Sequence, residues 1–178
     1  MNIVEKAHIF AMAAHAAVGQ KRKYTGEDYF NHCKEVHDIL HMQSSYYNGE
    51  MLAAALLHDV VEDTQVTLEL IEHQFGKCVA TLVEGLTDVS KKEDGNRAKR
   101  KEIDRQHTAK QSAACKTIKL ADLISNSKSI LQHDREFAKV YLKEKALLLE
   151  VLKEGDSYLW LQANQIVEDG LKQLEENL

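Results

Sequence analysis

The chain has 178 residues, of which 44% are hydrophobic and 29% charged, as expected for one compact domain with its own core. A formal net charge of -5 excludes the globally basic surface that binds nucleic acid or an anionic membrane, so we expect neither partner. The three cysteines are scattered without a C-x-x-C pair, which is typical of a protein in the reducing cytoplasm.

Apolar residues recur with helical spacing along nearly the whole chain. The first helix is expected over residues 4–18, because Val4, Ala7, Ala11 and Val18 share a face and Gly19 follows it. Charged side chains interrupt this segment, which argues against a signal peptide or a membrane span. We therefore expect a soluble, cytoplasmic protein.

A basic loop, "GQKRKYTGED", separates this helix from a second one, and a third contains "EMLAAALLHDVVED". Thr67 is expected to be the N-cap of the next helix, which Gly76 ends. The expected helices after the first cover residues 29–42, 50–63, 68–75, 77–89, 97–110, 113–132, 136–152 and 158–176.

No segment alternates with period two, and the chain contains no proline. We therefore predict an all-α fold, a single helical bundle domain over residues 1–178 with the C-terminal helices of 135–178 packing on the core. The last helix has apolar residues on competing faces, so it either packs within the domain or forms a homo-oligomer.

The stretch "ALLHDVVEDT" places three carboxylates next to a histidine. In a continuous helix, Glu62 follows His58 by four residues and Asp63 follows Asp59 by four, so each pair shares a face. Like charges at this spacing cost a few tenths of a kcal/mol, roughly, even when exposed. A bound divalent cation would remove this repulsion, whereas the alternative is a solvated acidic surface at a helix end.

Two further segments offer metal ligands. His32 in "YFNHC" lies at the start of a helix, and Asp122 in "IKLADLISN" lies within an apolar helical stretch. A lone aspartate among apolar neighbours must point outward or toward a partner. Two imidazoles and two carboxylates, from His32, His58, Asp59 and Asp122, suit Mn, Fe, Zn or Co better than Ca.

The segments "YFNH", "LLHDVVEDT", "FGKCVATLVEGLTDV" and "IKLADLISN", in this order, resemble the HD-domain hydrolase module of the RelA/SpoT family. The resemblance runs from about residue 8 to residue 152 and is greatest to the stand-alone small alarmone hydrolases. It implies an HD-domain helical bundle that removes pyrophosphate from the 3′ position of guanosine tetra- and pentaphosphate with Mn²⁺.

The same resemblance implies a role for each candidate residue. The metal ligands fall on the four residues named above, and Glu62 and Asp63 position or activate the attacking water. The basic loop residues Lys21, Arg22 and Lys23 correspond to those that meet the nucleotide. Asn126 and Tyr141 match positions implied in nucleotide contacts.

Three functions remain open from the sequence. The first is a metal-dependent 3′-pyrophosphohydrolase of guanosine or adenosine alarmones. The second is an HD phosphohydrolase acting on other nucleotides, such as a 5′-nucleotidase or a triphosphohydrolase. The third is a nucleotide-binding sensor without turnover. For single residues the alternatives are ordinary: Lys21, Arg22 and Lys23 can form a solvated loop, and Tyr141 can simply pack between helices.

Overall fold

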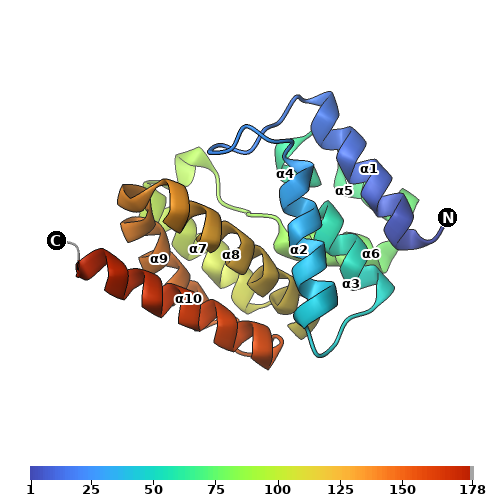
Figure 1. The fold of residues 1–178 in the computed structure, drawn as a ribbon. Helices are drawn as coiled ribbons and strands as arrows, with labels where there is room; N and C mark the ends of the chain where they lie inside the picture. Colours follow the sequence, from blue (N-terminus) through green and yellow to red (C-terminus); the bar gives the residue numbers. More distant parts are fainter. Residues whose placement is uncertain (177–178) are drawn as a thin grey trace. The chain divides into compact units, whose positions relative to one another are not determined.

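A computed structural model describes residues 1–176 of the chain, which divides into two compact units, Met1–Thr87 and Asp88–Leu178. Helices form both units (Figure 1). Over the described residues, the only β feature is an isolated bridge between Lys21 and Asp28. The predicted all-α class is therefore confirmed. The single domain over 1–178, with 135–178 packing on its core, remains a prediction.

The first unit is built around one buried helix. Its helices are α1 (Ile3–Ala17), α2 (Phe30–Gln43), α3 (Gly49–Leu57), α4 (Val60–Asp63), α5 (Leu68–Phe75) and α6 (Lys77–Leu86). Helix α3 packs against α1, α2 and α6, and all its residues from Met51 to Leu57 are buried. A helix that is apolar on every side must lie inside a fold. Each fully buried leucine contributes roughly 1.5–3 kcal/mol, so α3 anchors this unit.

Polar side chains cap the starts of α3 and α5, and the cap of α5 is the one that the sequence predicts. The Thr67 hydroxyl accepts a hydrogen bond from the backbone N–H of Leu70, which confirms Thr67 as the N-cap of α5. Asn48 accepts in the same way from the backbone N–H of Met51 at the start of α3. One expectation for α1 is wrong: Val18 is exposed, because α1 ends at Ala17 and the chain turns away there.

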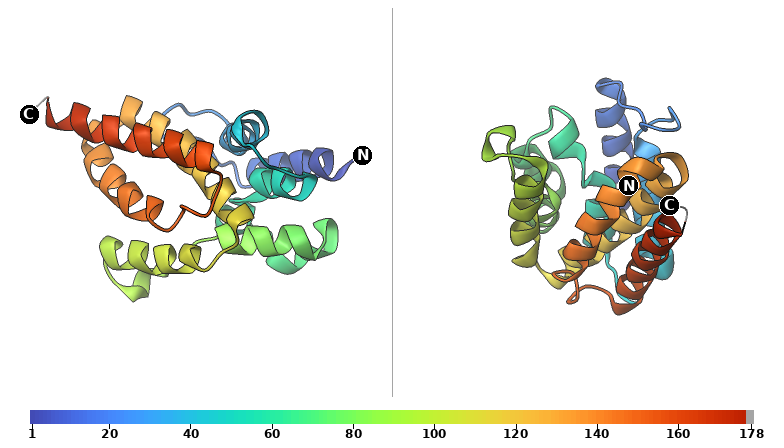
Figure 2. Two further views of the ribbon diagram at one scale, coloured as in Figure 1. Left: turned by 90° about the horizontal axis from the view of Figure 1, so that it is seen from below. Right: turned by 90° about the vertical axis from the view of Figure 1, so that its left-hand side faces the viewer.

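The second unit packs two helices against a long third one. It comprises the 3₁₀ turn η1 (Lys92–Asp94) and the helices α7 (Arg97–Ala109), α8 (Ala113–His133), α9 (Arg135–Leu149) and α10 (Ser157–Glu175). Helix α10 lies alongside α8 and α9 (Figure 2). A Cβ atom at Gly170 of α10 would lie 2.7 Å from a methyl carbon of Leu142 and 3.1 Å from Leu131. A larger residue at this position would therefore have to displace the leucine methyl groups that pack over Gly170.

The predicted helix over residues 50–63 is two helices in the structure. Helix α3 ends at Leu57 and α4 begins at Val60, with a turn at His58 and Asp59 between them. Within residues 1–176, no helix combines the length and apolarity that crossing a bilayer requires.

Candidate metal and active site

His58 ends helix α3 with its own side chain. The imidazole is buried, and its Nδ1 lies 2.8 Å from the carbonyl oxygen of Ala55. In a continuing helix this carbonyl would accept from the backbone N–H of Asp59, so the imidazole takes over a helical hydrogen bond where α3 ends. A carbonyl oxygen can only accept, so Nδ1 carries a ring proton, and in the neutral imidazole Nε2 then presents a lone pair.

Three of the four predicted ligands come together in the first unit. His32 from the start of α2, His58 and Asp59 each offer an atom, and these atoms all lie within 4.8 Å of one another. Asp59 Oδ2 is 3.0 Å from His58 Nε2 and 3.7 Å from His32 Nε2. Both imidazoles are buried and their ring centroids are 5.2 Å apart. Two imidazole nitrogens and one carboxylate oxygen thus converge on a single region.

The chemistry of this donor set fits a divalent metal ion. His58 Nε2 and Asp59 Oδ2 are both acceptors when Nδ1 of His58 holds the ring proton, yet they are only 3.0 Å apart. Two lone pairs at this distance repel unless a cation or a proton lies between them. A mixed nitrogen and oxygen set suits Mn, Fe, Co or Zn. His32, His58 and Asp59 can therefore hold such an ion.

Tyr29 orients the carboxylate of this group. Its hydroxyl donates a hydrogen bond of 2.6 Å to Asp59 Oδ2, and its ring packs against His32 with centroids 5.6 Å apart. A hydrogen bond to a ligating carboxylate fixes its orientation. The sequence analysis did not single out Tyr29. Its only signal is its position three residues before His32, which places both on one face of the helix start.

The acidic pair Glu62 and Asp63 lies on α4, which directly follows His58 and Asp59 in the sequence. Both residues are exposed, and Asp63 Oδ2 accepts a hydrogen bond of 2.9 Å from Gln20 Nε2. Partial desolvation raises the pKa of Asp63; the hydrogen bond from Gln20 opposes this rise, and the nearby charge of Asp59 adds to it. A carboxyl group with a raised pKa beside a metal-binding group is typical of a proton acceptor in catalysis.

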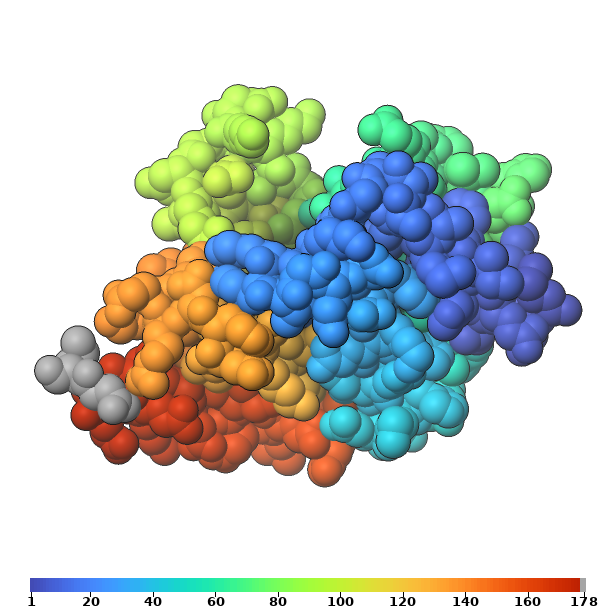
Figure 3. All heavy atoms as spheres, turned by 45° about the horizontal axis from the view of Figure 1, so that its top comes forward, coloured from blue at the N-terminus to red at the C-terminus, as the bar shows by residue number. Residues whose placement is uncertain are grey.

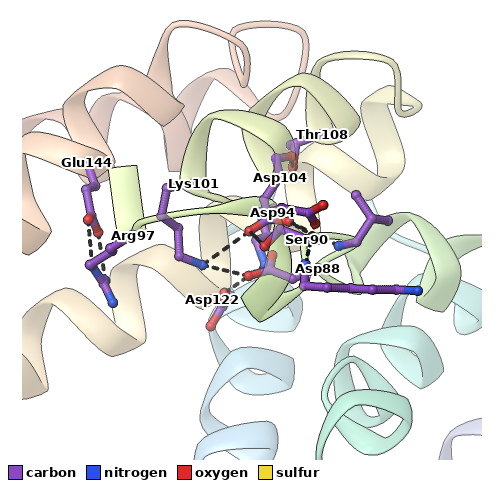
Figure 4. A network of polar contacts seen from close by, with 12 residues as sticks. Asp88, Ser90, Asp94, Arg97, Lys101, Asp104, Thr108, Asp122 and Glu144 are labelled. Atoms are coloured by element: carbon purple, nitrogen blue, oxygen red, sulfur yellow. Dashed lines mark hydrogen bonds and ion pairs between the residues drawn. The ribbon is translucent and has the colours of Figure 1, made fainter. Parts of the chain in front are cut away.

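The fourth predicted ligand, Asp122, belongs to the second unit and remains a prediction as a ligand. It is buried on α8, where Asn126 one turn later donates a hydrogen bond of 2.6 Å to its Oδ1. Lys119 Nζ lies 3.6 Å from Oδ2. The aspartate thus has polar partners within its apolar helix, as expected. Figure 4 draws Asp122 together with the polar network that α7 forms with the preceding loop.

Tyr141 lies in the second unit on α9 and is almost fully buried. Burial raises the pKa of its hydroxyl far above the usual range, so the hydroxyl stays protonated. The ammonium of Lys145, which the sequence analysis did not single out, lies 4.9 Å from the centre of the Tyr141 ring. Desolvation, with help from the charge of Lys119, lowers the pKa of Lys145 to about 8. The role of Tyr141 in substrate binding remains a prediction.

The basic loop forms a tight turn at the surface of the first unit (Figure 3). The backbone N–H of Arg22 donates to the carbonyl of Glu27, and Gly26 bonds back to Arg22 with a φ of 72°. Lys21 forms an exposed ion pair of 2.5 Å with Asp28. Ion pairs this exposed contribute little to stability, so the loop can exchange such partners for a ligand.

A scan against known families matches residues 7–147 to the HD domain. A Drosophila melanogaster protein named guanosine-3′,5′-bis(diphosphate) 3′-pyrophosphohydrolase MESH1 is 39% identical over 112 residues, which are 62% of this chain and 61% of the fly protein. A Danio rerio protein of the same name is 37% identical over 105 residues, which are 59% of this chain and 57% of that protein. The match therefore spans about three fifths of these relatives' lengths.

A solved structure of a metazoan ortholog of SpoT, described as hydrolysing ppGpp, superimposes with a TM-score of 0.85 and 29% identity. The superposition covers 96% of this chain and 97% of that chain. The structure of lmo0812 from Listeria monocytogenes shares the fold, with a TM-score of 0.65 and 23% identity over 83% of this chain and 99% of that one. Because the family match covers well over half of its residues, this chain belongs to the HD domain family.

Proposed function

We propose that this chain is a metal-dependent hydrolase that releases pyrophosphate from the 3′ position of guanosine 3′,5′-bis(diphosphate) and its pentaphosphate counterpart. The observation that carries the proposal is the convergence of His32, His58 and Asp59, followed directly by Glu62 and Asp63 on α4. Membership of the HD domain family and the printed activities of the fly and zebrafish relatives support it.

In this proposal His32, His58, Asp59 and Asp122 hold a divalent ion, with Mn²⁺ preferred. Such an ion would lower the pKa of a bound water to about 7 and would polarise a phosphoryl oxygen. His58 would supply a neutral imidazole nitrogen, Nε2, because its ring proton on Nδ1 is committed to the carbonyl of Ala55. Tyr29 keeps the carboxylate of Asp59 directed at the site through its hydrogen bond.

Asp63 and Glu62 act on the attacking water in this scheme. The raised pKa of Asp63 improves its ability to take a proton near neutral pH. Water adds across the bond between the ribose 3′ oxygen and the first phosphorus. Pyrophosphate leaves, and the nucleoside that remains has a free 3′ hydroxyl, with a 5′-diphosphate from the tetraphosphate and a 5′-triphosphate from the pentaphosphate.

The substrate contacts are part of the same proposal. Lys21, Arg22 and Lys23 lie on an accessible loop, and a guanidinium can bind a phosphate through two parallel hydrogen bonds or stack on a base. Asn126 and Tyr141 supply further polar contacts from the second unit. We propose a nucleotide of the guanosine class, with the adenosine counterpart as the competing substrate.

The cellular setting is also a proposal. The three cysteines form no disulfide, which is compatible with a reducing cytoplasm. We expect no membrane or nucleic-acid partner, and the prediction that the chain forms a homo-oligomer stays open to a sedimentation measurement.

The deciding experiment uses protein stripped with a chelator and reloaded with Mn²⁺. It is incubated with guanosine tetraphosphate, the adenosine counterpart, GTP and dGTP, and the products are resolved by ion-exchange chromatography. We expect pyrophosphate from the 3′-diphosphate substrates only, and at least a hundredfold lower rate in Asp59→Asn, as for loss of a charge-stabilising group at a reaction centre. The matched control is Asp169→Asn, which changes an exposed aspartate of α10.

Two other results would move the protein to another function. Release of phosphate or triphosphate from the ordinary nucleotides alone would indicate an HD phosphohydrolase with a different substrate. Tight nucleotide binding with no turnover in any metal-loaded sample would indicate a sensor.

A further inference from the structure

His15 lies at the centre of a hydrogen-bonded chain that ends on Asp63. His15 is buried on α1, on the face of Ala7 and Ala11. Its Nδ1 is 2.7 Å from Oε1 of Gln20, and Nε2 of Gln20 donates to Asp63 Oδ2 at 2.9 Å. On the other side, His15 Nε2 is 3.6 Å from Sγ of Cys33. A buried histidine with polar partners at both ring nitrogens orients these partners in addition to filling space.

The Asp63 carboxylate fixes the donor and acceptor of each hydrogen bond along the series from Asp63 through Gln20 and His15 to Cys33. A carboxylate can only accept, so the amide nitrogen of Gln20 faces Asp63 and the amide oxygen faces His15. That oxygen needs a donor, so the ring proton of His15 lies on Nδ1. The lone pair on Nε2 is then left to accept from the thiol of Cys33. Each group has one compatible orientation, and flipping the Gln20 amide would set an oxygen against the Asp63 carboxylate.

The backbone holds Gln20 in place independently of its side chain. Gly19 has a φ of 66°, a left-handed conformation that favours glycine, and it turns the chain at the end of α1. The backbone N–H of Gln20 donates to the carbonyl of His15 at 3.1 Å, and its carbonyl accepts from the backbone N–H of Tyr29 at 3.2 Å. The side chain of Gln20 therefore extends from an anchored residue.

We propose that Gln20, oriented by His15, is a positioning residue that holds the carboxylate of Asp63 in the geometry for accepting a proton. The proposal rests on the proposed hydrolase function for its catalytic consequence. The hydrogen bond joins two distant parts of the polypeptide, since Gln20 lies in the turn after α1, 43 positions before Asp63 in the sequence. Among residues 1–176, the side chain of Gln20 hydrogen-bonds His15 and Asp63 and none of the predicted metal ligands, so the proposal assigns its catalytic effect to Asp63.

The first test is a double-mutant cycle on the metal-loaded full chain. Gln20→Met keeps the length of the side chain and removes the donor. It is expected to lower kcat about 10- to 100-fold with little change in KM, as for other residues that orient a catalytic group. Combining it with Asp63→Asn should cost no more than Asp63→Asn alone, because a residue acting through Asp63 has nothing left to position. Additive losses would overturn the proposal.

A second variant and a matched control sharpen this test. Gln20→Glu keeps an oxygen for His15 and presents a carboxylate oxygen to Asp63, so we expect a loss of kcat at least as large as that of Gln20→Met. The control is Gln74→Met, which removes a half-buried glutamine whose amide likewise lies within hydrogen-bond distance of a histidine, His73, at 3.2 Å. This control should retain the wild-type rate, and a similar loss in all three variants would overturn the proposal.

The second test needs no turnover. The titration of the Asp63 carboxyl carbon is followed by NMR in the full chain without Mn²⁺. Because the hydrogen bond from Gln20 lowers the pKa of Asp63, Gln20→Met should raise this pKa and Gln74→Met should leave it unchanged. The carboxylate of Asp59 and the imidazoles of His15 and His58 also act on Asp63, and neither variant substitutes any of these three residues. An unchanged Asp63 titration in Gln20→Met would overturn the positioning role.

The two tests separate the positioning role from the proposed function. If the wild-type chain releases no product from any nucleotide, the hydrolase function fails. In that case the NMR titration still decides whether Gln20 orients Asp63.

Discussion

Replacing Tyr29 by phenylalanine should weaken binding of the metal ion while leaving all the predicted metal ligands in place. The variant removes the hydroxyl that donates to Asp59 Oδ2 at 2.6 Å and keeps the ring that packs against His15 and His32. The perturbation is therefore confined to one hydrogen bond beside a predicted ligand. Asp59 stays in place but loses the donor that restricts its rotamer.

The size of the effect follows from the kind of bond that is lost. A hydrogen bond to a charged group contributes about 1.5–3 kcal/mol. Loss of an outer partner of a metal ligand typically costs 10- to 100-fold in affinity, which corresponds to about 1.4–2.7 kcal/mol. The two ranges agree, so we expect the dissociation constant for Mn²⁺ to rise about 10- to 100-fold in Tyr29→Phe.

The assay is a titration of chelator-stripped protein with Mn²⁺, followed by the electron paramagnetic resonance signal of the free ion. Tyr46→Phe, which changes an exposed tyrosine of the same unit, serves as the control. At saturating Mn²⁺, Tyr29→Phe should recover most of the wild-type turnover. A change in affinity below about threefold would refute the argument that this hydroxyl orients a metal ligand.

Three other predictions concern buried and titrating groups. Asp104→Ala should destabilise the chain by about 3 kcal/mol or more, because the buried carboxylate of Asp104 accepts three hydrogen bonds from the loop before η1 (Figure 4). This loss corresponds to a fall of roughly 6–12 °C in Tm, and a fall below about 2 °C would contradict the prediction. Asp63→Asn should raise Tm at pH 7, because the raised pKa of Asp63 means that its charge disfavours the folded state. This gain should disappear as the pH falls through the folded-state pKa to the ordinary carboxyl value, and a gain that persists at pH 3 would disprove the assignment. Among the thiols, exposed Cys78 should react with iodoacetamide in the native protein, whereas the buried Cys33 and Cys115 should not. Burial raises the pKa of Cys115 to about 11, which keeps this thiol protonated and unreactive. Fast labelling of all three cysteines would show that the fold opens readily.

The helices and their caps could be predicted from local patterns. Helical spacing of apolar residues located α1, α2 and α8, and the hydroxyl of Thr67 marked the start of α5. The break between α3 and α4 could not be predicted in this way. It depends on the side chain of His58 competing for a helical carbonyl, while the sequence around it favours an uninterrupted helix.

In the candidate site, too, some residues could be predicted from local patterns and others could not. The residue types and their order predicted His32, His58 and Asp59 as metal ligands, because imidazole and carboxylate are the groups a divalent transition ion needs. The groups that support them were not apparent. No local pattern singled out His15 or Gln20, and the carboxylate that Gln20 contacts lies 43 residues away in the sequence.

The sequence by itself determined the chemistry and the local structure of this protein: which segments form helices, which side chains can bind a metal, and which carboxyl groups can accept a proton. The tertiary structure alone decided how these groups are oriented. A hydrogen bond such as that from Tyr29 to Asp59, or from Gln20 to Asp63, joins segments that are remote in the chain. Its geometry depends on how helices pack, and side-chain packing is a property of the whole fold that no local pattern encodes.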